Sequence, residues 1–128
     1  MRIFHFGGEE PCESMNELKL VLDKRFGSNA NEFWIHPDYS DYPCIGLMVI
    51  QDFAYIQFFT EEGSPSFQPT GNTMNLNPDE CTVFYTNTVD EEIEVPNDAV
   101  ISFSIALSAV EEFFISSELP TCLEWFEL

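Results

Sequence analysis

The stretch CIGLMVIQDFAYIQFFT, residues 44–60, determines the expected fold. Two apolar runs, Cys44–Ile50 and Phe53–Thr60, are separated by only two residues, Gln51 and Asp52. Two such runs across so short a polar turn are typical of a β-hairpin. Because both faces of the first run are apolar, and the second repeats that character, we predict that they form the centre of an antiparallel sheet.

Shorter runs on either side of this hairpin indicate further strands. These runs are Arg2–Phe6, Asn31–Pro37, Ser66–Gln68 and Cys81–Thr86. The segment Gly71–Glu80 is rich in Asn and Pro and is expected to be a loop. An acidic connection beginning at Asp90-Glu91-Glu92 leads through Pro96 to Ala99–Ile101.

Two segments have the apolar spacing of amphipathic helices. The first is Met15–Phe26, where Ser14 and Glu17 form a capping-box pattern and Gly27 follows as a C-cap. The second begins after Ser102, and Pro120 prevents its continuation. Its apolar stripe consists of Phe103, Ala106, Leu107, Val110, Phe113 and Phe114. The sequence therefore predicts one α+β domain over residues 1–128, an antiparallel sheet with two helices.

The charge of the chain is strongly negative. Its 128 residues hold 23 Asp and Glu against four Lys and Arg, a formal charge of −19. The last basic residue is Arg25, and the 103 residues from Phe26 onward contain eighteen acids. This balance disfavours binding to nucleic acid or to anionic membrane surfaces. No apolar run is long enough to span a membrane, and the start lacks a secretory h-region, so a cytoplasmic protein is expected.

No motif of catalysis or of metal binding is present. The four cysteines contain no CxxC pair, and reduced, buried thiols are expected. His36 with Asp38 and Asp41 could hold a metal, but a satisfied histidine beside a turn is the favoured interpretation. The chain also lacks a phosphate-binding glycine loop and the GxSxG and HExxH motifs. We therefore expect no enzyme activity, no metal and no cofactor.

The net negative charge of the chain is larger than solubility requires. A small domain needs a net charge of about 2–8 to stay soluble, well below the 19 negative charges of this chain. Such an excess favours a function in binding a basic partner. Since basic proteins commonly bind nucleic acid, a stoichiometric inhibitor that imitates phosphate is the natural form of this function.

The end of the chain adds a resemblance. The run VISFSIALSAVEEFFISSELPTCLEWFEL, residues 100–128, resembles the C-terminal signature of a family of bacterial polymorphic-toxin immunity proteins, the family catalogued as number one. The matching residues are Ala109, Phe113, Phe114, Pro120, Trp125, Glu127 and Leu128. The run GLMVIQDFAYIQFFTEEG, residues 46–63, is similar to the central hairpin of that family. Residues 1–40 match only in general layout.

The resemblance implies an immunity protein that binds and neutralises a cognate secreted toxin domain, often a nucleic-acid deaminase. A monomer that forms a 1:1 complex with a basic toxin is expected. Trp125 is expected to pack under the second helix. The candidate toxin contacts are Asp52, Phe53, Tyr55, Glu61, Glu62, Glu91, Glu92, Glu124, Phe126 and Glu127.

Two rival functions remain open at this point. One is an acidic DNA mimic that inhibits a restriction or repair enzyme. The other is a small enzyme that uses carboxylates such as Asp38, Asp41, Asp52 or Glu61.

Overall fold

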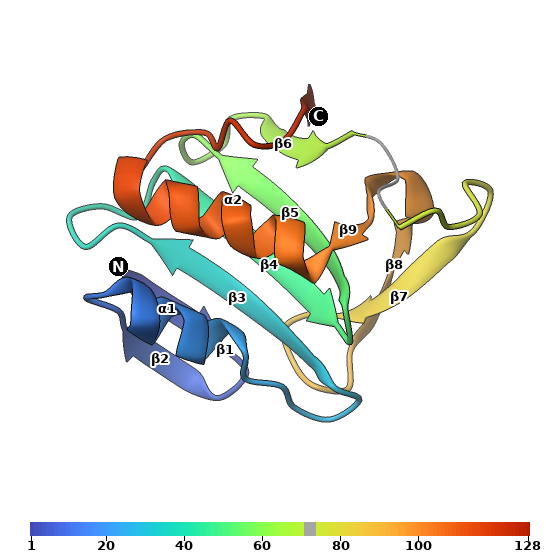
Figure 1. Ribbon diagram of the computed structural model, residues 1–128, viewed down its shortest axis with the longest axis horizontal. Helices are drawn as coiled ribbons and strands as arrows, with labels where there is room; N and C mark the ends of the chain where they lie inside the picture. Colours follow the sequence, from blue (N-terminus) through green and yellow to red (C-terminus); the bar gives the residue numbers. More distant parts are fainter. Residues whose placement is uncertain (71–73) are drawn as a thin grey trace.

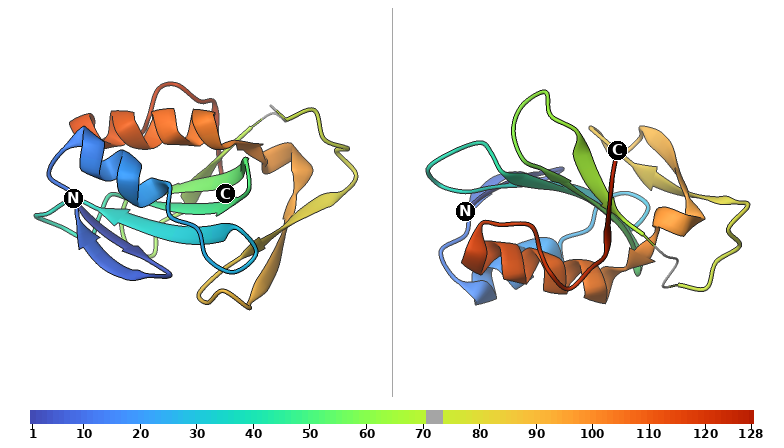
Figure 2. Two further views of the ribbon diagram at one scale, coloured as in Figure 1. Left: turned by 60° about the horizontal axis from the view of Figure 1, so that its bottom comes forward. Right: turned by 90° about the horizontal axis from the view of Figure 1, so that it is seen from above.

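The computed structural model, which describes residues 1–70 and 74–128, shows an α+β fold in which two helices cover one face of an antiparallel sheet (Figures 1 and 2). The strand order is β10-β6-β5-β4-β3-β1-β2, and β9 pairs with β5. A separate two-stranded sheet joins β7 and β8. The elements are β1 Arg2–His5, β2 Gly8–Pro11, α1 Met15–Leu22, β3 Ala30–His36, β4 Cys44–Ile50, β5 Phe53–Phe59, β6 Ser66–Pro69, β7 Cys81–Tyr85, β8 Glu92–Pro96, the 3-10 turn Asn97–Ala99, β9 Ile101–Ser102, α2 Phe103–Ser116 and β10 Trp125–Glu127.

The predicted central hairpin is confirmed. Strands β4 and β5 pair along their full length, from Cys44 opposite Phe59 to Ile50 opposite Phe53. Their two-residue turn places Gln51 at φ 51°, the left-handed conformation that matches the twist of a tight hairpin. The Gln51 amide donates to the carbonyl of Asn29 at 3.0 Å, which ties this turn to the loop before β3.

Alternation along the strands divides the apolar side chains between two layers. Leu47, Ile56 and Phe33 are fully buried beneath the helices, where they meet Phe113 of α2. Ser14 and Ser102 cap α1 and α2 by accepting from the amides three residues on, as the sequence predicts. This helix-covered face holds the main hydrophobic core.

The β7–β8 hairpin covers part of the opposite face. Phe84 of β7 is fully buried and packs with Met48 of β4 and Val95 of β8 in a second apolar cluster. Figure 2 shows the hairpin beyond one end of the main sheet, on the side away from the helices. Among the described residues, no further strand or helix covers the rest of that face.

Helix α1 and the strands β2 and β8 differ from the sequence prediction. Helix α1 ends at Leu22 and not at Phe26, because Phe26 forms a bridge with Ala30 through two backbone hydrogen bonds. The strands β2 and β8 were not predicted. Their sequences, GEEP and EIEVP, are short, and each contains two glutamates. Pairing with a neighbouring strand defines them, and apolar composition does not. Of the predicted loop Gly71–Glu80, residues 71–73 lie outside the described part, and the remainder contains turns and bends.

The expectation of four buried thiols is wrong for two of them. All four cysteines are free; Cys12 and Cys44 are buried, whereas Cys81 and Cys122 are exposed. Cys81 is the first residue of a two-stranded ribbon that has only one covered face, and Cys122 lies in the turn before β10. Sequence spacing carries no signal for either position.

These positions predict an order of thiol labelling. Burial raises the pKa of Cys44 to about 11 and also raises the pKa of Cys12. Burial and the nearby Glu112 carboxylate raise the pKa of Cys122. Since the thiolate is the reactive form, a maleimide at pH 8 should modify Cys81 first, Cys122 more slowly, and the two buried thiols only in denaturant. Mass spectrometry of timed samples measures this order, and fast labelling of Cys44 in the folded protein would contradict it.

Candidate functional site

An uncovered aromatic surface lies on the sheet face opposite the helices. Cross-strand pairs place Phe4 beside Trp34, Trp34 beside Gly46, and Gly46 beside Gln57. Directly paired residues point to the same face, so this row faces away from the helices. At the sheet's other edge, Phe126 is paired with Gln68 on the same face. We call these residues, together with Phe59, the open face.

Large aromatic side chains on the open face remain accessible. The exposed fractions are 38% for Phe4, 36% for Trp34 and 56% for Phe126. The Trp34 ring lies across Gly46, where a Cβ atom would come within 2.9 Å of it. The ring centroids of Trp34 and Phe59 are 5.6 Å apart. Trp34 is thus held in one orientation while one side of it stays available to a partner.

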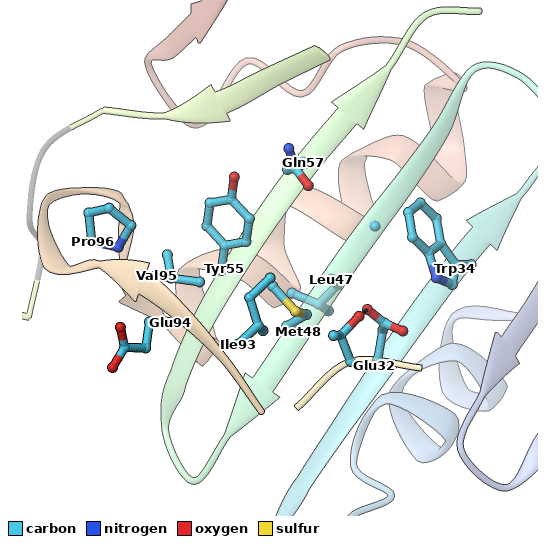
Figure 3. A pocket seen from close by; sticks show the side chains of 12 residues that line it. Glu32, Trp34, Leu47, Met48, Tyr55, Gln57, Ile93, Glu94, Val95 and Pro96 are labelled. Carbon is cyan, nitrogen blue, oxygen red and sulfur yellow. Dashed lines mark hydrogen bonds between the residues drawn. The ribbon is translucent and has the colours of Figure 1, made fainter. Parts of the chain in front are cut away.

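A groove of about 340 Å³ runs between the open face and the β7–β8 hairpin (Figure 3). Its walls include Trp34, Met48 and Tyr55 from the sheet and Ile93 and Val95 from the hairpin. The pairing of β7 with β8 explains this orientation. Thr82 lies opposite Val95 and Phe84 opposite Ile93, which turns the apolar side chains toward the sheet. The alternating acids of β8 therefore point to the outer side of the hairpin.

Glu32 fixes the hairpin over the sheet. This β3 residue is only 7% exposed. One carboxylate oxygen accepts from the Thr86 hydroxyl at 2.6 Å and the other from the Asn87 amide at 2.9 Å. Since Glu32 is two residues before Trp34, both side chains lie on the same face and both line the groove. A buried carboxylate with two donors is a costly feature to build, and here it sets the position of the hairpin turn.

Sequence reasoning did not identify Glu32, Trp34 or Gly46. The one available signal was the presence of an acid, Glu32, and a glycine, Gly46, inside otherwise apolar strands. A buried acid often marks a specific polar contact, and a glycine in a strand often marks a close approach of another group. The predicted contact Tyr55 does line the groove, and its hydroxyl donates to the side-chain oxygen of Gln68 at 2.8 Å.

The acidic turns selected from the sequence lie at opposite ends of the sheet. Asp52 follows Gln51, whose amide bonds to the loop before β3. That same loop contains Gly27, which lies against Val89 of the turn preceding Glu91 and Glu92. The three acids are exposed, whereas Phe53 is half-buried. These residues therefore gather at one end.

Glu61 and Glu62 occupy the other end, in the β5–β6 turn. The chain terminus joins them there because the Leu128 amide donates to the Ser66 carbonyl at 2.8 Å, which places Glu127 nearby. Glu61 accepts from the Ser64 hydroxyl, and all three acids are exposed. The predicted contacts thus form two acidic ends joined by the open face, rather than one cluster.

The tail is fastened to α2 by hydrogen bonds and ring packing. Trp125 donates from Nε1 to the Pro120 carbonyl at 2.8 Å, and its ring centroid is 6.4 Å from that of Phe58. Glu112 of α2 accepts from the Thr121 hydroxyl and amide, and these bonds lower the pKa of Glu112. Of the other residues in the signature, Phe113 and Pro120 are buried, Phe114 is half-buried, and Glu124 and Leu128 are exposed.

The carboxylates suggested for a metal or for catalysis do not converge. Asp38 binds the amino terminus at 2.9 Å, and Asp41 binds Arg2 at 3.0 Å. His36 contacts the Asp41 backbone carbonyl through Nδ1. Across residues 1–70 and 74–128, no group of three or more His, Cys, Asp or Glu side chains is arranged to hold a metal ion.

The sequence as a whole matches one family. The profile of the family described as Immunity protein Imm1 matches residues 7–127. The chain belongs to the Imm1 family of immunity proteins. An Imm1 protein acts by inhibiting a toxin. The hypothesis that this chain is a small enzyme using carboxylates is therefore wrong. A 123-residue alignment that covers 96% of each chain relates this Imm1 protein, at 26% identity, to the double-stranded DNA deaminase immunity protein of Burkholderia cenocepacia (strain H111).

Family membership also favours the hypothesis of an immunity protein over that of an acidic DNA mimic that inhibits a restriction or repair enzyme.

Within the described part of this Imm1 protein, neither helix has the length and hydropathy to cross a membrane.

Proposed function

We propose that this Imm1 protein binds a cognate toxin that deaminates DNA and neutralises it in the cytoplasm by covering the toxin's active-site or substrate cleft. The observation that carries this proposal is the family match over residues 7–127, together with a relative named for immunity to a double-stranded DNA deaminase. The protein acts without chemistry of its own.

The charge of the chain suits such a target. An enzyme that acts on DNA must attract a polyanion, so the cleft that receives DNA carries basic side chains. A nucleobase deaminase must also admit the target base into a narrow pocket, which a bound protein can close. The 19 net negative charges of the immunity protein favour fast association with a basic cleft.

The proposed complex contains one copy of each protein. The main core and the second apolar cluster are both completed within one chain. A strongly acidic surface opposes self-association, since two copies would bring like charges together. These two features support a monomeric inhibitor and a 1:1 complex.

The test uses a DNA-deaminase toxin domain, which is sought among the genes that neighbour the one for this chain. Light scattering of the immunity protein mixed with a catalytically inactive toxin domain should give the mass of a 1:1 complex. The active toxin should lose deamination of a double-stranded DNA substrate at one equivalent of immunity protein. Labelled DNA bound to the inactive toxin should be displaced as the complex forms. A toxin that binds the immunity protein while retaining DNA would refute occlusion, and failure to bind would refute the function.

A further inference from the structure

We propose that the toxin docks on the open face of the sheet and places a basic side chain in the groove between Trp34 and Ile93. This inference rests on the proposed function, because it names the surface through which the same toxin is bound. The occupant is an Arg or Lys side chain on a protruding segment of the toxin.

The aromatic content of the open face is the first argument. Phe4, Trp34 and Phe126 are three of the large apolar side chains left exposed, and all point away from the helices. Interface energy concentrates in such aromatic anchors when a partner excludes water from them. By contrast, the two most exposed apolar side chains of the helix layer, Leu20 and Ile115, lie on different helices.

The groove supplies the second argument, because it combines a carboxylate with an aromatic wall. Glu32 lines the groove, and each of its oxygens accepts one bond from the hairpin. A carboxylate oxygen can accept two, so capacity for a further donor remains. The ring of Trp34 on the adjacent wall can contact the apolar stem of a Lys or Arg, or its charge through a cation–π interaction.

The placement of the basic residues supplies the third argument. Arg2 is on the open-face side of β1, but its guanidinium is bound to Asp41 and to the carbonyls of Pro37 and Ser40. Lys24 binds both oxygens of Glu10, and Arg25 lies over the Phe103 ring of α2. Among the described side chains, no unpaired Lys or Arg of the immunity protein therefore lies at the groove to repel a cation of the toxin.

A second copy of this chain is a poor occupant. Two open faces brought together would also bring together the acidic ends at Glu61-Glu62 and at Glu91-Glu92. Both ends belong to the part of the chain after Arg25, so neither end carries a Lys or Arg that could neutralise the other. The face therefore matches a basic partner and not itself.

The experiment compares the open face with the helix layer. Trp34→Ala removes the anchor, and its control is Ile115→Ala, which truncates a more exposed apolar side chain of α2. Gln57→Lys adds a positive charge beside the groove, and its control is Ser108→Lys, the same change on an exposed α2 position. Affinity for the same catalytically inactive toxin domain as in the test of function is measured by calorimetry, with thermal unfolding midpoints for every variant.

We expect Trp34→Ala to weaken binding at least about 30-fold, the effect of an interface hot spot, and Gln57→Lys at least about tenfold. Both controls should stay within about twofold of the unmodified protein. If Trp34→Ala unfolds, Gln57→Lys decides the outcome. Open-face variants that bind as tightly as the unmodified protein would overturn this inference and leave the proposed function intact. An unmodified protein that fails to bind would overturn both.

Discussion

Replacement of Glu61, Glu62, Glu91 and Glu92 by Lys is expected to slow association with the toxin about 10- to 100-fold at low salt, without unfolding the protein. The change moves the formal charge from −19 to −11, since each substitution replaces one negative charge by one positive charge. Exposed rim charges chiefly set the association rate. All four side chains are exposed. The substitutions remove the hydrogen bonds of Glu61 with Ser64 and of Glu91 with Asn87.

Stopped-flow mixing at several salt concentrations measures this effect. The difference from the unmodified protein should shrink toward 1 M salt, where the Debye length falls to about 3 Å. The two ends can be separated by testing the Glu61-Glu62 pair and the Glu91-Glu92 pair alone. The control for either pair is Glu13→Lys with Glu118→Lys, which changes the charge as much as one pair does, at exposed positions away from both turns. If the quadruple variant associates as fast as the unmodified protein at low salt, these turns do not steer the encounter.

Trp125→Ala is expected to lower the free energy of unfolding by about 2–4 kcal/mol, close to the range for loss of a large core aromatic. The lower end reflects that Trp125 is half-buried. The substitution removes the packing against Phe58 and the hydrogen bond to the Pro120 carbonyl. Such a loss is a large part of the stability of a small domain. Urea unfolding followed by circular dichroism measures it without relying on the deleted fluorophore.

Phe126→Ala provides the matched control for this prediction. Phe126 is the next residue of β10, is 56% exposed and faces the opposite side of the sheet. Its truncation should cost less than about 1 kcal/mol of stability. A Trp125→Ala variant with an unchanged unfolding midpoint and lost toxin binding would make Trp125 a contact residue instead.

The central strands and both helices were predictable because local patterns encode them. The hairpin β4–β5 needs only two apolar runs and a two-residue turn, and both helices carry serine caps and periodic apolar residues. Strand β8 was hidden because its alternation of Glu with Ile and Val resembles an acidic connection. Only pairing with β7 turns that alternation into one covered and one exposed face.

The candidate site was less predictable, because it depends on register between strands. Trp34 and Gly46 are twelve positions apart, and their contact exists because β3 and β4 pair with Trp34 opposite Gly46. A shift by one residue would turn Trp34 toward the helices. The apolar residues on both faces of β4 also concealed which face the helices cover. The acidic turns can be found from the composition of the sequence, but the open face that connects them cannot be found in that way.

The confinement of basic residues to the first 25 positions has a consequence for how the protein rotates in solution. That segment forms β1, β2 and α1 at one side of the fold and holds four basic and five acidic side chains (Figure 1). The remaining 103 residues hold eighteen acids and no Lys or Arg. This separation is a permanent electric dipole. Near a cationic molecule the dipole experiences a torque that turns the almost neutral side away, so productive orientations are selected before the two surfaces touch.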